Sequence, residues 1–208
     1  MFKDRIDAGK KLGNSLKKYK DENLLVLALP RGGVVVGYEV AKKLKAPFSI
    51  IVSRKIAAPS IPEYGIGAVS EGAYFLDKEN VRDVGLKKDQ LDVLIKLQED
   101  EVKRRVKLYR GRKLPILSEK TVILVDDGLA TGVTAFAAIE ALIKLKAGKI
   151  IFAAPVCDRR TAKKLGRKAK AVECLLYPEL SSVGYYYLNF SQTSDEEVVE
   201  ILSKAKRK

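Results

Sequence analysis

The chain alternates short apolar runs with longer segments of helical periodicity, and this alternation constrains its fold more than any other feature. Apolar runs of strand length predict buried strands, whereas apolar residues three and four apart predict helices. Strands that alternate with helices are typical of a parallel sheet. We therefore predict an α/β fold with a central, mostly parallel sheet flanked by helices. The predicted strands are 24–29, 48–53, 121–125, 149–156 and 171–177, and the predicted helices are 2–19, 34–44, 87–109, 160–167, one from about 133 and one opened by Ser194.

The length of 208 residues is enough for one ample core, so we expect a single domain over 1–208. Residues 56–72 hold prolines and glycines and are predicted to form a loop, broken by a short strand near 66–69. A loop of this length is more often functional than a plain connector.

The charge is strongly unbalanced, with 40 Lys and Arg against 26 Asp and Glu and a formal net charge of +14. The basic residues are spread along the chain, which favours an anionic partner without identifying it. Histidine is absent, which excludes Ser-His and Cys-His nucleophiles and any histidine metal ligand.

The two cysteines, Cys157 and Cys174, lie far apart and form no C-x-x-C pattern, so we expect neither a disulfide framework nor a zinc site. A reducing cytoplasm fits this cysteine usage best. The first residues, "MFKDRIDAGKKLG", lack the apolar core of a signal peptide, and no apolar run approaches the roughly 20 residues that span a bilayer. We expect a soluble protein without a membrane partner.

The stretch "TVILVDDGLATGVT" carries the strongest chemical signal. Asp126 and Asp127 follow a predicted strand, and open α/β sheets bind ligands at the carboxyl ends of their strands. Residues 130–134 lead into a helix whose free N–H groups suit a phosphate, and Gly132 lets a ligand approach the backbone. Because two carboxylates can accept hydrogen bonds from a sugar diol, the whole stretch indicates a sugar phosphate site. The alternative is an Asp-Gly turn followed by an ordinary threonine helix cap.

This stretch resembles the phosphoribosyl-pyrophosphate signature of the type I phosphoribosyltransferases. It departs from the family pattern at Gly128, where an aliphatic residue or serine is usual. The resemblance implies that Asp126 and Asp127 hold the ribose hydroxyls. It also implies that the 5′-phosphate is held by Ala130, Thr131, Gly132, Val133 and Thr134.

Two further segments resemble the family in order and spacing. "LPRGG" is similar to the pyrophosphate loop, which implies that Arg31 and the amide of Gly32 bind the diphosphate and that the Pro30–Arg31 peptide is cis. "SRK" places Arg54 and Lys55 where the family often has cationic contacts to the same group. A plain turn and a solvated strand end are the alternatives. Other phosphate motifs do not match, since G-x-x-x-x-G-K-[ST] is absent and "GIGAVSEG" has the wrong spacing for G-x-G-x-x-G.

The whole chain looks most like the uncharacterised "predicted phosphoribosyltransferase" group, which carries similar "LPRGG", "GAV-EG", "DDGLATG" and "FSQTSDEEV" segments. The resemblance implies a type I phosphoribosyltransferase-like fold with a core over about 24–156. It further implies an inserted long helix at about 87–109 and a hood or tail over about 175–208.

The implied activity is Mg²⁺-dependent transfer of a phosphoribosyl group from phosphoribosyl pyrophosphate to a nucleobase-like acceptor, with release of pyrophosphate. Arg31, Arg54 and Lys55 would stabilise the leaving group, and the two aspartates the cationic sugar. The substrate would hold most of the Mg²⁺ shell, with Asp126 and Asp127 nearby rather than as assigned ligands. A homodimer is expected from the family.

The acceptor is not identified. Ala130 stands where hypoxanthine–guanine enzymes carry an acid, and "ATG" resembles the adenine enzymes instead. Those enzymes have a catalytic glutamate in a mobile loop, so Glu63 of "PEYG" is the candidate acid or base, with a solvated loop residue as the alternative. In enzymes of the family that recognise guanine or hypoxanthine, a lysine binds the oxo group of the base. The corresponding position here falls near Cys157, which argues against that mode of recognition. The tail "SVGYYYLNF" either covers the base or forms an apolar strand.

Two other functions stay open at this point. Some relatives sense phosphoribosyl pyrophosphate while binding nucleic acid, and the charge of +14 suits that role. A hydrolase or phosphorylase acting on a phosphorylated sugar is a third alternative.

Overall fold

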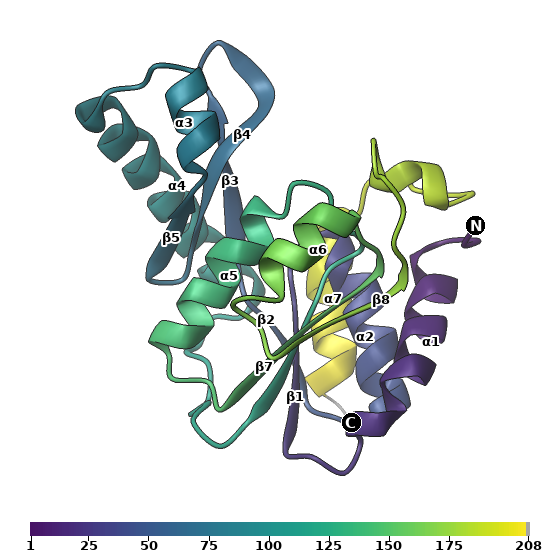
Figure 1. Ribbon diagram of the computed structural model, residues 1–208. Coiled ribbons are helices and arrows are strands. Elements are labelled where there is room, and N and C mark those ends of the chain that lie inside the picture. The colour runs from purple at the N-terminus through teal and green to yellow at the C-terminus, as the bar shows by residue number, and fades with distance from the viewer. Residues whose placement is uncertain (207–208) are drawn as a thin grey trace.

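A five-stranded parallel sheet forms the centre of the computed structural model, which describes residues 1–206 (Figure 1). Its strand order is β2-β1-β6-β7-β8, and every neighbouring pair is parallel. The α/β class and the parallel sheet predicted from the alternating pattern are confirmed. The strands are β1 (Leu24–Ala28), β2 (Phe48–Ile50), β6 (Thr121–Val125), β7 (Lys149–Val156) and β8 (Ala171–Leu176).

The central strands are apolar at every position because both faces of the sheet are covered. Side chains alternate between the faces, so Val122 and Leu124 pack into one core and Ile123 and Val125 into the other. β1 and β6 pair in register from Leu24 opposite Thr121 onward, which brings the two strands to an end at the same edge.

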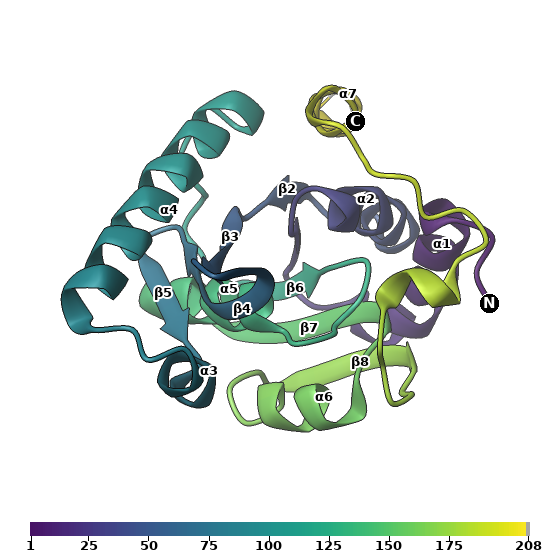
Figure 2. The same ribbon diagram turned by 90° about the horizontal axis from the view of Figure 1, so that it is seen from above.

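Helices cover both faces of this sheet (Figure 2). One face is covered by α1 and α2, with a short 3₁₀ helix, η1, after α1, and the other by α5 and α6. α5 is buried along most of its length because it also packs against a second, smaller sheet. The bounds are α1 (Arg5–Ser15), η1 (Leu16–Tyr19), α2 (Gly32–Leu44), α5 (Val133–Lys144) and α6 (Arg159–Leu165).

The second sheet corrects the prediction of a long loop over residues 56–72. It is antiparallel and consists of β3 (Ser53–Ala58), β4 (Ile61–Ser70) and β5 (Ala73–Leu76). Pro59 lies in the hairpin turn, where a missing N–H costs nothing, and the register shifts on both sides of Ala57. The prolines and glycines therefore mark a bulged hairpin rather than a structureless loop. The single strand predicted over 48–53 is likewise divided, because the chain leaves one sheet after Ile50 and enters the other at Ser53.

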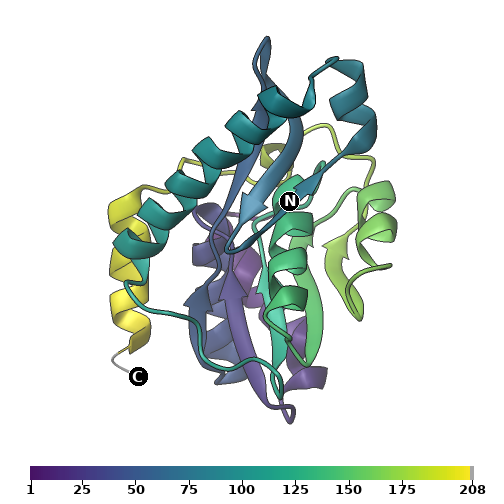
Figure 3. The ribbon, with the colours of Figure 1, turned by 90° about the vertical axis from the view of Figure 1, so that its left-hand side faces the viewer.

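The inserted α4 (Lys88–Tyr109), preceded by the short α3 (Lys78–Asp83), packs on the second sheet (Figure 3). The C-terminal α7 (Asp195–Lys206) packs against α4, α2 and β2, and its apolar residues belong to the same core as those of α4. The long helix begins within one residue of its predicted start. On its surface, Glu101 pairs with Arg105 four residues ahead and with Arg104 three residues ahead, and Asp100 pairs with Lys103.

The N-terminus and the tail are tied together. Phe2 donates its amide to the carbonyl of Tyr186 at 2.8 Å, and its ring lies 5.4 Å from that of Tyr187. The segment "VGYY" forms a 3₁₀ helix, η2 (Val183–Tyr186), so the alternative of an apolar strand is wrong. The helix predicted to open at Ser194 is confirmed, and Ser194 and Glu197 form a capping box at its start with bonds of 2.7 and 3.2 Å.

The two cysteines form a disulfide, which corrects the expectation that they stay unpaired. The parallel pairing of β7 with β8 brings Cys157 and Cys174, 17 residues apart, to a Cα–Cα distance of 6.1 Å. This separation lies within the usual disulfide range. Sequence spacing carries no information on this proximity. Among the described residues, no helix combines the length and the apolar character needed to cross a membrane.

Candidate active site

The predicted site residues follow β1 and β6, two adjacent parallel strands. Leu29 donates its amide to the carbonyl of Val125 at 2.9 Å, so the chains leaving both strands stay side by side. Asp126 begins one of these segments, and Arg31 belongs to the other. The Pro30–Arg31 peptide is cis, as the resemblance led us to expect.

Two glycines let the "PRGG" loop lie directly against the two aspartates. A Cβ added to Gly32 would collide with the carboxylate of Asp127, and one added to Gly33 would lie 2.9 Å from the Cα of Asp126. Side chains at these positions are therefore excluded, and the backbone of the loop is held against the carboxylates. The structure thus brings together the predicted pyrophosphate loop and the predicted ribose-binding pair.

The two carboxylates have different surroundings. Asp126 accepts the amide of Asp127 at 2.8 Å, and burial, together with the neighbouring Asp127 carboxylate, raises the pKa of Asp126 well above its ordinary value. Asp127 is paired with Arg5, whose Nε lies 2.7 Å from Oδ2. The Arg5 guanidinium also lies 3.9 Å from the ring centre of Phe190. Arg5 was missed by the sequence reasoning, because nothing in the pattern of α1 distinguishes it from the other surface cations.

The loop from Ala130 to Thr134 forms the N-terminus of α5, as predicted. Gly132 is the N-cap residue with φ of 75°, a left-handed conformation that favours glycine. Because this N-cap supplies no side-chain acceptor, the first N–H groups of the helix are not capped by a side chain. Such an uncapped helix N-terminus suits an anion.

The predicted cations divide into two groups. Burial lowers the pKa of the Arg54 guanidinium. The positive charges of Arg105 and Arg31 lower it further. The buried Nε of Arg54 has no hydrogen-bond partner within residues 1–206. Lys55 instead reaches along the hairpin to Glu63, with Nζ 3.9 Å from Oε2. Only Arg54 of this pair therefore joins Arg31.

A cluster from α4 and α7 surrounds these two arginines, and the sequence reasoning missed it. Asp195 lies 3.6 Å from Nη1 of Arg31 and accepts the hydroxyl of Tyr109 at 2.6 Å. Burial and this bond raise the pKa of Tyr109 to about 12, and the same bond lowers the pKa of Asp195. Asp195 belongs to the segment "FSQTSDEEV", and the similarity of this segment to the family was the sequence signal that could have identified it. The inserted helix and the C-terminal helix thus meet at the predicted pyrophosphate position.

Glu63 lies in β4 rather than in a loop, and its side chain is 99% exposed. Gly65, two residues further along, would place a Cβ 3.6 Å from Cγ2 of Val133 in the predicted phosphate loop. The hairpin therefore leans against that loop, but the polar contacts of Glu63 within residues 1–206 are with Lys55 alone. Its role stays a prediction.

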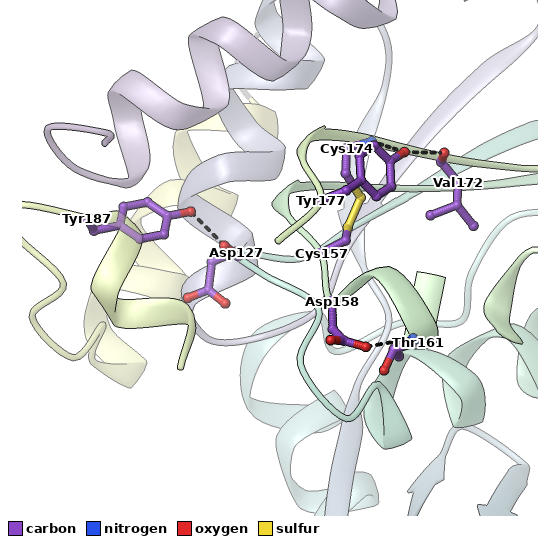
Figure 4. Close-up of a disulfide and its surroundings, with 8 residues drawn as sticks. All are labelled: Asp127, Cys157, Asp158, Thr161, Val172, Cys174, Tyr177 and Tyr187. Atoms are coloured by element: carbon purple, nitrogen blue, oxygen red, sulfur yellow. Dashed lines mark hydrogen bonds between the residues drawn. A yellow bond between two sulfur atoms is a disulfide. The ribbon is translucent and has the colours of Figure 1, made fainter. Parts of the chain in front are cut away.

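The tail explains the departure from the family pattern at Gly128. A Cβ at this glycine would collide with the side chain of Val183, so Val183 occupies the space of the usual aliphatic residue. Next to it, Tyr187 donates its hydroxyl to the carbonyl of Asp127 at 2.6 Å (Figure 4). Burial, chiefly, and the Asp127 charge raise the pKa of Tyr187. The aromatic tail therefore packs directly on the aspartate motif.

The disulfide lies on the other side of the same motif (Figure 4). Leu129 and Cys157 form an isolated parallel bridge, and Asp158 donates its amide to the carbonyl of Leu129 at 2.7 Å. Asp158 in turn caps α6 by accepting the amide of Thr161 at 2.8 Å. The end of β7 and the phosphate loop are thus held together by backbone bonds.

The buried charge of Asp126 leads to a prediction about stability. When the pKa of a carboxyl is raised in the folded state, the protein loses stability as the pH rises from the pKa of that group in the unfolded chain toward its pKa in the folded state. We expect Asp126→Asn to increase the free energy of unfolding at pH 8 by on the order of 1 kcal/mol. The gain should shrink toward pH 4. Urea unfolding at both pH values, with the exposed Asp92→Asn as control, measures it; a variant less stable than the parent at pH 8 would contradict the assignment.

Comparison with known proteins places this geometry in a family. Residues 4–188 match the family described as "Phosphoribosyl transferase domain". Two curated relatives from Mycobacterium tuberculosis, each named "Putative phosphoribosyl transferase", are 40% identical over 210 residues; the chain is covered completely but spans only 47% of their length. TT1426 from Thermus thermophilus is 35% identical over 98% of both chains, with a TM-score of 0.81. AQ2163 from Aquifex aeolicus, 13% identical with a TM-score of 0.53 over 83% of this chain and 74% of its own, shares the fold alone. The chain therefore belongs to the type I phosphoribosyltransferase family.

Proposed function

We propose that this chain binds phosphoribosyl pyrophosphate and transfers its phosphoribosyl group to a nucleobase-like acceptor, releasing pyrophosphate. One observation carries the proposal. A carboxylate pair, an uncapped helix N-terminus and two neighbouring arginines meet at a single edge of the sheet. Each part suits one portion of the substrate, and the "PRGG" loop is held against the carboxylates by Gly32 and Gly33.

The sugar end of the substrate binds at the start of α5. The amides of Ala130 to Thr134 and the hydroxyls of Thr131 and Thr134 hold the 5′-phosphate. Asp126 and Asp127 accept hydrogen bonds from the ribose diol. Asp127 is paired with Arg5, so the ribose diol either shares the Asp127 carboxylate with Arg5 or displaces Arg5 from it.

The diphosphate binds the arginine pair and the amide of Gly32. Arg54 is incompletely compensated, because its buried Nε lacks a partner among residues 1–206. The charges of Arg105 and Arg31 also oppose its own charge, and only Glu101 among the described acids acts to offset them. An incoming anion removes this penalty, which favours binding. Asp195 holds Arg31 beside the diphosphate position. Lys55, which pairs with Glu63 in this structure, would turn away from the hairpin to reach the diphosphate.

During transfer, a nitrogen of the acceptor attacks the anomeric carbon while the bond to the pyrophosphate oxygen breaks. Negative charge grows on the leaving group and positive charge on the sugar. Arg31 and Arg54 stabilise the first, and the aspartates stabilise the second. Glu63 is the proposed base for the acceptor proton, which requires the hairpin to bend further over the site.

Asp126 and Asp127 are suited to a Mg²⁺ ion whose other ligands come mainly from the substrate. Within residues 1–206, no group of three or more His, Cys, Asp or Glu side chains could hold a metal by itself. Mg²⁺ is commonly bound by one or two carboxylates together with substrate phosphates and water, and Asp126 and Asp127 supply such carboxylates. When bound, the ion would offset charge on the diphosphate.

The acceptor would lie beneath the aromatic tail, between Tyr187 and the end of β7. Cys157 is fully buried and disulfide-bonded, so it offers no donor for an oxo group. The homodimer, the single-domain organisation and the cytoplasmic location stay predictions.

Isothermal titration with phosphoribosyl pyrophosphate and Mg²⁺, followed by a screen of bases for pyrophosphate release, tests the proposal. Asp127→Asn keeps the shape of the side chain but loses a charge-assisted hydrogen bond, so affinity should fall about 10- to 100-fold. Asp92→Asn is the matched control. Unchanged affinity in both Asp126→Asn and Asp127→Asn would contradict the diol assignment. Binding without release from any base would favour the alternative, a nucleic-acid-binding sensor suited by the net charge of +14.

A second experiment addresses Glu63. A general base typically contributes about 10²–10⁴-fold, so Glu63→Gln should lower turnover by that order with an active acceptor. Affinity for phosphoribosyl pyrophosphate should stay nearly unchanged, because the described contacts of Glu63 are with Lys55 alone. Glu79→Gln, an exposed change on α3, is the control. An unchanged rate would show that Glu63 is a solvated surface residue.

A further inference from the structure

A cavity of about 720 Å³ lies outside the proposed active site. It is an open cavity lined by the C-terminal half of α4, the loop that follows this helix, the turn between β4 and β5, and the end of α5. None of the residues assigned to the sugar phosphate or the diphosphate lines it. Its volume falls in the range of small-molecule sites.

The cavity has an apolar wall. Val102 and Val106 contribute from successive turns of α4, and Leu114 and Leu145 face them from the loop and from the end of α5. Leu145 is 42% exposed, and Ile143, two residues before it, is 48% exposed. An apolar or aromatic group of a ligand would cover this surface and remove it from water.

The rim of the cavity is cationic. Lys107, Arg112 and Lys113 are exposed and form no ion pair with any of residues 1–206. Of the two carboxylates in the lining, Glu71 is already neutralised by Arg110, which leaves Glu99. The rim therefore carries an excess of positive charge that an anionic group would balance.

The floor of the cavity contains a buried, incompletely bonded cation. Arg110 is 8% exposed, and its guanidinium is bonded to Glu71. Its Nε has no partner among the described residues. Buried polar groups are seldom left without a hydrogen bond, and such exceptions often mark an absent ligand or water.

We propose that this cavity binds an organic anion. Its apolar or aromatic body packs between α4 and Leu145, and its phosphate, sulfonate or carboxylate group is held by Lys107, Arg112 and Lys113. The site is separate from the proposed transferase site, and the proposal does not rest on that function.

The same floor is joined to the segment that carries Arg54. Glu71 accepts the amide of Val52 at 3.0 Å, and Arg110 donates to the carbonyl of Ile50 at 3.5 Å. These residues connect β2 to β3 just before Arg54. A ligand that restrains Arg110 and Glu71 therefore also restrains this connecting segment. Through it, binding in the cavity is coupled to the position of Arg54 beside Arg31.

Titration with 8-anilinonaphthalene-1-sulfonate, an aromatic sulfonate whose fluorescence rises in apolar surroundings, tests the site. We expect saturable binding, weakened about tenfold or more by Lys107→Glu, by Lys113→Glu and by Leu145→Asp. Lys88→Glu, an exposed charge reversal on α4 outside the cavity, is the control and should bind normally. All these positions are at the surface, so circular dichroism should show intact folds.

Hydrogen exchange locates the probe. The peptide containing Val52 should exchange more slowly with the probe bound, and the peptide over 126–134 should not change. Competition then distinguishes the ligand class: displacement by octanoate assigns an aliphatic carboxylate, and displacement by phenyl phosphate an aryl phosphate. Equal binding by the three cavity variants, protection of 126–134 instead of Val52, or displacement by neither competitor would overturn the proposal.

Discussion

The parallel pairing of β1 with β6 is the constraint on which the rest of the structure depends. Because the two strands pair in register and end together, the "PRGG" loop and the aspartate pair leave the sheet at the same edge. Gly32 and Gly33 then allow the loop to lie against the carboxylates. The cost falls on Asp126, whose ionised form is disfavoured by burial and by the neighbouring carboxylate of Asp127. A site that concentrates charge in this way is poorly compensated by the protein alone, and a charged ligand relieves it.

Much of this arrangement could be predicted from the sequence, since it depends on local patterns. "TVILV" and "LLVLA" are apolar throughout because both faces of their sheet are covered, and each is followed directly by its functional residues. The cis peptide and the glycine at the start of α5 follow from motifs of a few residues. The long helix and the capping box at Ser194 are equally local.

The parts that could not be predicted depend on contacts between distant segments. Arg5 contacts Asp127, which is more than a hundred residues away in the sequence, and Asp195 near the C-terminus contacts Arg31 near the N-terminus. The disulfide arises from strand pairing that cysteine spacing does not reveal. In the hairpin of β3 and β4, the prolines at the turn and at the irregularly paired start of β4 were mistaken for loop signals. Val183 shows the same limit, because a residue of the tail fills the space that Gly128 leaves in the motif.

A crystal structure of the chain with phosphoribosyl pyrophosphate and Mg²⁺ tests the central claim most directly. The account predicts the 5′-phosphate on the amides at the start of α5, between Thr131 and Thr134. It predicts the ribose hydroxyls on the aspartate pair and the diphosphate in contact with both Arg31 and Arg54. A ligand ordered elsewhere, with both arginines free of phosphate oxygens, would contradict it.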